Sequence, residues 1–319
     1  MLFRSHCAVH KFNFPETAII PKSVVGLTAA EIRRAAGIGD QVVDCVFGGP
    51  PCQGFSLIGH RVLDDPRNKL VLEFVRIVAE LDARTFVFEN VKGLTVGRHK
   101  AFLEELVVAF DEAGYDVRRD WQVLDAANFG VPQHRERLIL LGAKKGMEIP
   151  LYPIPSTDAA DGRGKTFGLD KGPTCLDALG DLPDADRFEE LCDTDFVETN
   201  AYGEPSVYAR ELRGLSNKPW HFGYEREWKK QLLTSSVRTG HSEISQRRFT
   251  ETEPGSVEPI SRFYKLSPGG LSNTLRAGTD GARGAFTSPR PIHYENPRDR
   301  KSTRLNSSHT DISRMPSSA

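Results

Sequence analysis

The chain has 319 residues, of which 39% are hydrophobic and 27% charged, as is typical of a globular protein with one large domain or two smaller ones. No apolar run approaches the roughly 18 residues of a membrane span, and the start lacks a secretory signal, so we expect a cytoplasmic protein that neither crosses nor binds a membrane. The net charge of -1 neither supports nor excludes nucleic-acid binding, because a local basic face is sufficient for it.

The five cysteines show no paired C-x-x-C spacing. We therefore expect neither a metal site nor a disulfide framework. A reducing compartment is the simple interpretation. Cys45 lies within an apolar run and is the cysteine expected in the core.

Strands and helices alternate through the first half of the chain. The expected elements are strands at 42–47 and 85–88, helices at 68–81 and 100–113, and strands at 116–124 and 137–142. This alternation predicts parallel βαβ units in an open α/β sheet, with ligands at the carboxyl ends of the strands. Gly37-Ile38-Gly39 follows a helical pattern rather than a strand, which argues against a phosphate-binding loop there.

Regular helical spacing fades after about Gly146, where prolines and glycines become frequent. We expect helices only at 176–182 and 225–233, and interpret the region to about Leu266 as a smaller, irregular second domain. Residues 267–298 then return toward the first domain.

The last 21 residues, 299–319, change abruptly to Ser, Thr, Arg and Asn. Residues 299–309 and 313–319 can be back-translated, in order and in one frame, as the two ends of a common sequencing adapter. We interpret the segment as an artefact rather than as a disordered polar tail, and expect the natural sequence to continue differently after Arg298.

Cys52 lies in the loop Gly48-Gly49-Pro50-Pro51-Cys52-Gln53-Gly54-Phe55-Ser56, directly after a predicted strand. Prolines fix the path of such a loop, and glycines allow close approach of a ligand to the backbone. A free cysteine is often just a small buried side chain, but a loop at a strand end is usually accessible. Position alone leaves a catalytic and a structural role equally open.

Two further polar groups follow predicted strands or begin them. Glu89 ends one strand, where a carboxylate could act as a general acid or simply cap a turn. Arg135 and Arg137 are two residues apart at the start of another strand, so their side chains should share a face. They could hold a carbonyl or phosphate, or form a solvated strand entrance paired with Glu136.

Together these segments resemble the C5-cytosine-specific DNA methyltransferase family. The segment 48–56 resembles its nucleophile motif, Glu89-Asn90-Val91 its general-acid motif, and residues 133–137 its Q-x-R-x-R motif, in the family's order. Further similar segments extend the likeness over about 11–298. The resemblance implies an α/β, Rossmann-like S-adenosylmethionine-dependent methyltransferase sheet, here incomplete, with a smaller irregular target-recognition domain. Residues 1–146 would be the partial catalytic domain and 147–266 the target-recognition domain.

The resemblance also implies a mechanism. Cys52 would attack C6 of a cytosine flipped out of duplex DNA, Glu89 would hold N3, and Arg135 would bind O2. Arg137 would position Cys52 or Glu89. C5 would then accept a methyl group from S-adenosylmethionine. Pro50 and Leu70 would contact part of this cofactor.

The sequence departs from the family at both ends. No F-x-G-x-G cofactor loop precedes Cys52, and the late motifs that complete the cofactor pocket are missing. We therefore expect this chain to be a truncated form that methylates poorly. Its expected partners are double-stranded DNA and a restriction endonuclease encoded nearby, with the protein itself a monomer.

Contacts with the DNA backbone are expected from Lys229, Lys230, Arg247 and Arg248, although such charges often only face solvent. Thr274-Leu275-Arg276-Ala277 resembles a family segment that ends the target-recognition domain. Three alternatives remain: a tRNA cytosine-5 methyltransferase, a catalytically dead DNA-binding relative, and a thiol redox protein, the last weakened because no resolving cysteine lies near Cys52.

Overall fold

The computed structural model describes residues 7–8, 10–11, 14–51, 68–97, 99–194, 196–216, 229–234, 240–274 and 291–296. The chain divides into two compact units. The first comprises Met1–Asp125 and Glu136–Ile154, and the second comprises Ala126–Arg135 and Pro155–Ala319. The ten-residue connection at 126–135 thus leaves the first unit and returns to it.

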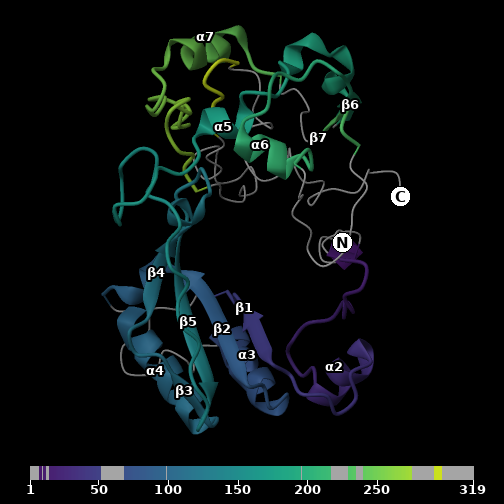
Figure 1. Cartoon of the computed structure of the whole chain (residues 1–319), viewed down its shortest axis with the longest axis vertical. Coiled ribbons are helices and arrows are strands. Elements are labelled where there is room, and N and C mark those ends of the chain that lie inside the picture. The colour runs from purple at the N-terminus through teal and green to yellow at the C-terminus, as the bar shows by residue number, and fades with distance from the viewer. Residues whose placement is uncertain are drawn as a thin grey trace. The chain divides into compact units, whose positions relative to one another are not determined.

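The first unit is built on a five-stranded sheet (Figure 1). Strand β1 (Cys45–Gly48) is parallel to β2 (Thr85–Val91), and β2 is antiparallel to the long strand β5 (Glu136–Lys144). Strands β3 (Tyr115–Val117) and β4 (Gln122–Asp125) pair with the other edge of β5, each near one of its ends.

The sheet is mixed: the expected parallel pairing is present between β1 and β2, whereas the antiparallel pairing of β5 with its neighbours was not expected. A parallel connection needs a crossover of a dozen residues or more, and the short link from β4 to β5 cannot provide one, so the two strands pair antiparallel. The single strand expected at 116–124 is instead two strands, because residues 118–121 leave the ladder between β3 and β4.

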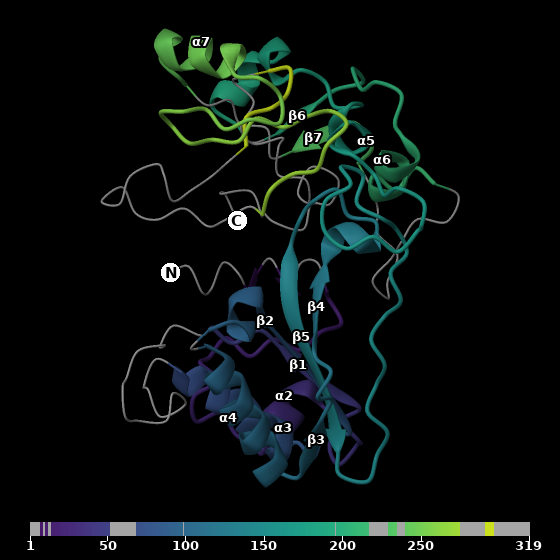
Figure 2. The same cartoon turned by 90° about the vertical axis from the view of Figure 1, so that its left-hand side faces the viewer.

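Helices α3 (Lys69–Glu80) and α4 (His99–Glu112) confirm the expected positions within two residues and lie on one face of the sheet (Figure 2). Helix α2 (Ala29–Ala36) begins with a capping box formed by Thr28 and Glu31. It ends at Gly37 in the left-handed conformation, which confirms that this glycine terminates a helix.

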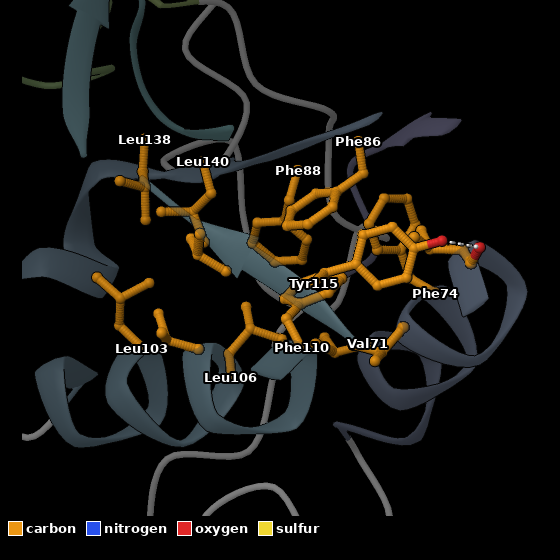
Figure 3. Packing of buried hydrophobic residues seen from close by; sticks show 14 of the residues in the cluster. Val71, Phe74, Phe86, Phe88, Leu103, Leu106, Phe110, Tyr115, Leu138 and Leu140 are labelled. Carbon is orange, nitrogen blue, oxygen red and sulfur yellow. Dashed lines mark hydrogen bonds between the residues drawn. The ribbon is translucent and has the colours of Figure 1, made fainter. Parts of the chain in front are cut away.

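The core of the first unit lies between the sheet and these two helices (Figure 3). Phe86 of β2 stacks on Phe110 of α4 with ring centroids 3.9 Å apart. Tyr115 reaches into the same core and donates its hydroxyl to the carbonyls of Val78 (3.0 Å) and Ala83 (2.8 Å). Burial raises the pKa of Tyr115, so this tyrosine stays a neutral donor.

Strand β1 differs from the expected buried strand. Val46 packs against the core, but Cys45 is exposed and Phe47 is 80% exposed. Their Cα partners are Thr85 and Val87, on the face of β2 opposite to Phe86, and α3 and α4 cover only the other face. The expectation that Cys45 is the core cysteine was therefore wrong. Cys175, in the second unit, is fully buried.

The second unit contains short elements. Helices α5 (Cys175–Leu179), α6 (Val207–Leu212) and α7 (Glu243–Glu251) accompany the antiparallel pair β6 (Phe196–Glu198) and β7 (Leu232–Thr234). Helix α5 confirms the expected helix at 176–182 in part. The expected helix at 225–233 was wrong at its end, where strand β7 begins, and its residues 225–228 lie outside the described residues. Helices α6 and α7 were not expected. Among the described residues, 3-10 helices lie at Lys92–Thr95, Ala126–Phe129, Ala185–Arg187 and Glu189–Cys192.

Polar contacts supplement several small apolar clusters in the second unit. The fully buried carboxylate of Asp181 accepts a 2.5 Å hydrogen bond from Arg213, whose guanidinium lies 3.7 Å from the centroid of the Tyr202 ring. In both units, no helix among the described residues combines the length and the apolarity that crossing a membrane requires.

Gly142 sets how closely β5 approaches β2. A Cβ built on this residue would overlap the ring of Phe86, its Cα partner across the ladder. We expect Gly142→Ala to lower the free energy of unfolding by about 1–3 kcal/mol, because the displaced ring would disturb its stack on Phe110. Denaturant unfolding measures this.

Gly93→Ala is the matched control, since a Cβ there meets no atom within 4 Å. Equal stability of the two variants would contradict the tight packing of Phe86 over Gly142.

Candidate functional site

An ion pair joins the two central strands near the carboxyl end of β2. Nε of Arg137 lies 2.7 Å from Oε1 of Glu89. Val91 and Arg137 are Cα partners, so Arg137 lies diagonally across from Glu89 on the same face of the sheet. The guanidinium also donates through Nη1 to the carbonyl of Glu136 at 2.8 Å. The two contacts fix the orientation of both side chains.

The other carboxylate oxygen of Glu89 faces the loop after β1. A Cβ built on Gly49 would lie 2.5 Å from Oε2 of Glu89, closer than any side chain allows. A side chain at position 49 would therefore displace the Glu89 carboxylate, and glycine avoids this. The Glu89 carboxylate thus lies directly against the start of the loop that leads to Cys52.

Asn90 ties the same loop to β2. Its Nδ2 donates to the carbonyl of Pro50 at 3.0 Å, and its Oδ1 accepts from the backbone N–H of Val91 at 2.9 Å. Asn90 is 7% exposed and follows Phe86 and Phe88 on the helix-facing side of the strand. A polar side chain at a buried strand position needs specific partners, and here the partner is the loop.

Cys52 itself, with the rest of 52–67, lies outside the described residues. The structure describes the approach to it through Pro51. Pro50 and Leu70 are both partly accessible, Pro50 in this loop and Leu70 in the first turn of α3. Glu136, a candidate partner for the arginines, pairs with Lys92 instead.

Arg135 belongs to the second unit and is exposed. The backbone around it is firmly held: its carbonyl accepts from the N–H of Ala126 at 3.2 Å, and the N–H of His134 donates to the carbonyl of Ser272 at 3.0 Å. The hydroxyl of Thr274 donates to the carbonyl of His134 at 2.7 Å. The segment at 272–274 therefore holds the backbone of His134, the residue before this arginine, through two hydrogen bonds.

The residues expected to contact the DNA backbone differ in their exposure and in whether they form ion pairs within the protein. Lys229 and Lys230 are exposed. Arg247 pairs with Glu251 at 2.8 Å, and Arg248 is partly buried with Nε 3.7 Å from Glu258. These arginines already have carboxylate partners within the protein, which weakens them as phosphate contacts.

The motifs themselves did not reveal two features of this site. The tether from Asn90 to Pro50 joins residues 40 positions apart, and only the polar break in the buried side of β2 hinted at it. The contact between Gly49 and Glu89 depends on the parallel register of β1 and β2. Chemically, the arrangement is a carboxylate in a fixed orientation beside residues 49–51, which precede Cys52 in the chain.

Comparison with known proteins identifies the family of the chain. The family model of the C-5 cytosine-specific DNA methylases matches residues 5–276. The chain is 55% identical over 293 residues to the type II methyltransferase M.XorII of Xanthomonas oryzae, covering 92% of this chain and 66% of that protein. It is 40% identical over 286 residues to M.BsuRI of Bacillus subtilis, covering 86% and 59%.

The chain thus spans 66% and 59% of the length of these two relatives. A crystal structure assigned as a DNA modification methyltransferase encoded within an Escherichia coli prophage has the same fold, with a TM-score of 0.69 over 97% of this chain and 81% of that one, at 24% identity. The Rossmann-like methyltransferase fold expected from the sequence is confirmed. The chain belongs to the C-5 cytosine-specific DNA methylase family.

Proposed function

We propose that this chain forms the nucleophile and cytosine-binding part of a DNA (cytosine-5-)-methyltransferase of a type II restriction-modification system. The observation that carries the proposal is the Glu89 carboxylate, fixed by Arg137 and lying against the loop that leads into Cys52. Membership of the family and the type II relatives support it.

The roles of the residues follow from the chemistry of cytosine. C6 is a weak electrophile, and a thiolate adds there only if N3 and O2 take up the electron density. Cys52 supplies the thiolate, Glu89 holds a proton at N3, and Arg135 donates to O2. Addition makes C5 nucleophilic; after methylation a base removes the C5 proton and Cys52 leaves.

Arg137 acts as a positioning residue in this scheme. Its Nε holds Oε1 of Glu89, so the second oxygen stays directed toward the loop. Asn90 positions the loop from the other side by holding the Pro50 carbonyl. The acid and the chain segment that leads to Cys52 are therefore both held by the same strand, β2, which favours their alignment.

S-adenosylmethionine supplies the methyl group when it is bound. Among the described residues, Pro50 and Leu70 keep accessible apolar surface close to the carboxyl end of β1 and the start of α3. They fit the apolar edge of such a ligand. We assign Pro50 and Leu70 to this apolar contact alone, because neither side chain carries a polar group that could bind the charged groups of S-adenosylmethionine.

The substrate is duplex DNA with the cytosine flipped out, since a stacked base does not present its ring face to a thiolate. We assign the target-recognition domain to residues 147–266, of which 155–266 belong to the second unit. The protein acts as a cytoplasmic monomer, and its restriction endonuclease partner cleaves the same unmethylated sequence.

Cys52→Ser tests the covalent step. Addition of the thiol at C6 lets C5 exchange its hydrogen with water, even without a methyl donor, so tritium at C5 of duplex DNA is released. We expect the variant to release it roughly 1000-fold more slowly or not at all, with DNA binding unchanged. Release at background level by both proteins would show a binding protein without this chemistry. Faster release from tRNA than from DNA would favour the RNA-modifying alternative.

Glu89→Gln and Arg137→Lys separate the acid from its support. We expect Glu89→Gln to slow tritium release by about 100- to 10,000-fold, because the amide cannot deliver a proton to N3. Arg137→Lys keeps the charge but loses the planar guanidinium, and should cost only about ten-fold. An Arg137→Lys loss as large as that of Glu89→Gln would make Arg137 a direct substrate contact.

Asn90→Asp tests the loop tether. The carboxylate still accepts from Val91 but no longer donates to the Pro50 carbonyl. We expect the turnover of tritium release to fall roughly 10- to 100-fold with little change in KM for DNA, since the loop would lose alignment rather than affinity. A change confined to KM would contradict the tether.

A further inference from the structure

One exposed loop of the second unit is held unusually firmly. Residues 161–168, here called the basic loop, read Asp-Gly-Arg-Gly-Lys-Thr-Phe-Gly, and residues 162–168 are all exposed. The loop contains Arg163 and Lys165 and has glycines with positive φ at 162, 164 and 168. Glycine allows these turns without steric strain.

A buried carboxylate organises the end of the basic loop. Asp158 is 8% exposed and accepts three backbone hydrogen bonds: Oδ1 from Phe167 at 2.7 Å, and Oδ2 from Gly168 and Leu169, both at 3.0 Å. Asn128 adds a hydrogen bond from Nδ2 to the carbonyl of Lys165 at 3.2 Å. The backbone is thus pre-organised while the charged side chains remain in solvent.

The charges of the basic loop are largely unneutralised. Among the described residues no carboxylate forms an ion pair with Lys165, and Arg163 is only 3.8 Å from Asp161, with its side chain 71% exposed. By contrast, Arg247 and Arg210 hold carboxylates at 2.8 and 2.7 Å. Two cations held apart from acidic partners on a rigid loop suit an anionic ligand.

The basic loop begins beside Arg135. Nε2 of His134 lies 3.1 Å from Oδ2 of Asp161, so the first residue of the loop contacts the neighbour of the arginine to which we assign cytosine O2. Asp161 also accepts a hydrogen bond from the backbone N–H of Arg163 at 3.0 Å, which forms a turn at the start of the basic loop. All these residues belong to the second unit.

We propose that the basic loop binds the DNA phosphates next to the flipped cytosine through Arg163 and Lys165. This inference rests on the proposed function, because it takes Arg135 as a contact of the target base. A flipped nucleotide stays attached to its backbone, so cations on a loop that contacts His134, the neighbour of the base-binding arginine, suit its flanking phosphates. The pre-organised backbone lowers the entropy lost when the two side chains bind.

The test measures binding of the full chain to a short fluorescein-labelled DNA duplex at several salt concentrations. For Arg163→Ala/Lys165→Ala we expect about ten-fold weaker binding and a plot of log affinity against log salt that is shallower by about 2, since each phosphate contact contributes about 0.9 to the slope. Arg163→Lys/Lys165→Arg should keep the wild-type slope.

Arg187→Ala is the matched control: Arg187 is an exposed arginine of the same unit, among the acidic residues Asp184, Asp186 and Glu189. It should leave the slope unchanged. An unchanged slope in the double alanine variant, with normal folding by circular dichroism, overturns the role of the loop.

Tritium release from C5 distinguishes this failure from failure of the proposed function. A wild-type chain that releases tritium, together with a double variant that keeps the full slope, removes only the loop inference. A wild-type chain that neither releases tritium nor binds the duplex removes both.

Discussion

The pairing of β2 with β5 is the constraint on which the rest of the first unit depends. Seven Cα pairs fix its register, and Gly142 allows the Phe86 ring to lie against β5. A slip by one residue would turn every side chain of β5 to the opposite face. Arg137 would then point toward the helices and away from Glu89. The packing of one phenylalanine and the geometry of the acid are thus set by the same ladder.

The sequence predicted those parts of the fold that depend on local pattern. Helices α3 and α4 were found because their apolar residues repeat with helical spacing, and Gly37 was correctly placed after a helix. The motifs identify Glu89 and Arg137 as candidates, whereas their contact depends on the register of β2 and β5. The order and type of these segments were sufficient to identify the family.

What the sequence did not predict depends on neighbours distant in the chain. Phe47 is as apolar as Phe86, but its exposure depends on which face α3 and α4 cover. The antiparallel direction of β5 depends on where the connection at 126–135 goes. The position of Asn90 in its motif does not indicate its hydrogen bond to the Pro50 carbonyl. This bond depends on the pairing of β1 with β2, which places the two residues side by side. In the second unit, α6 and α7 start at Ser206 and Ser242, whose side chains cap short helices with weak periodicity.

The different environments of the cysteines determine how the thiols of this chain can be labelled. Cys45 and Cys192 are exposed, whereas burial raises the pKa of Cys175 to about 12 and keeps it both shielded and protonated. An alkylating reagent meant to report on Cys52 would therefore also modify Cys45, on the open face of β1, and Cys192. Replacing these two residues and the partly exposed Cys7 by serine, and leaving Cys175 in place, would remove the competing accessible thiols from the described part of the chain without opening a cavity in the second unit.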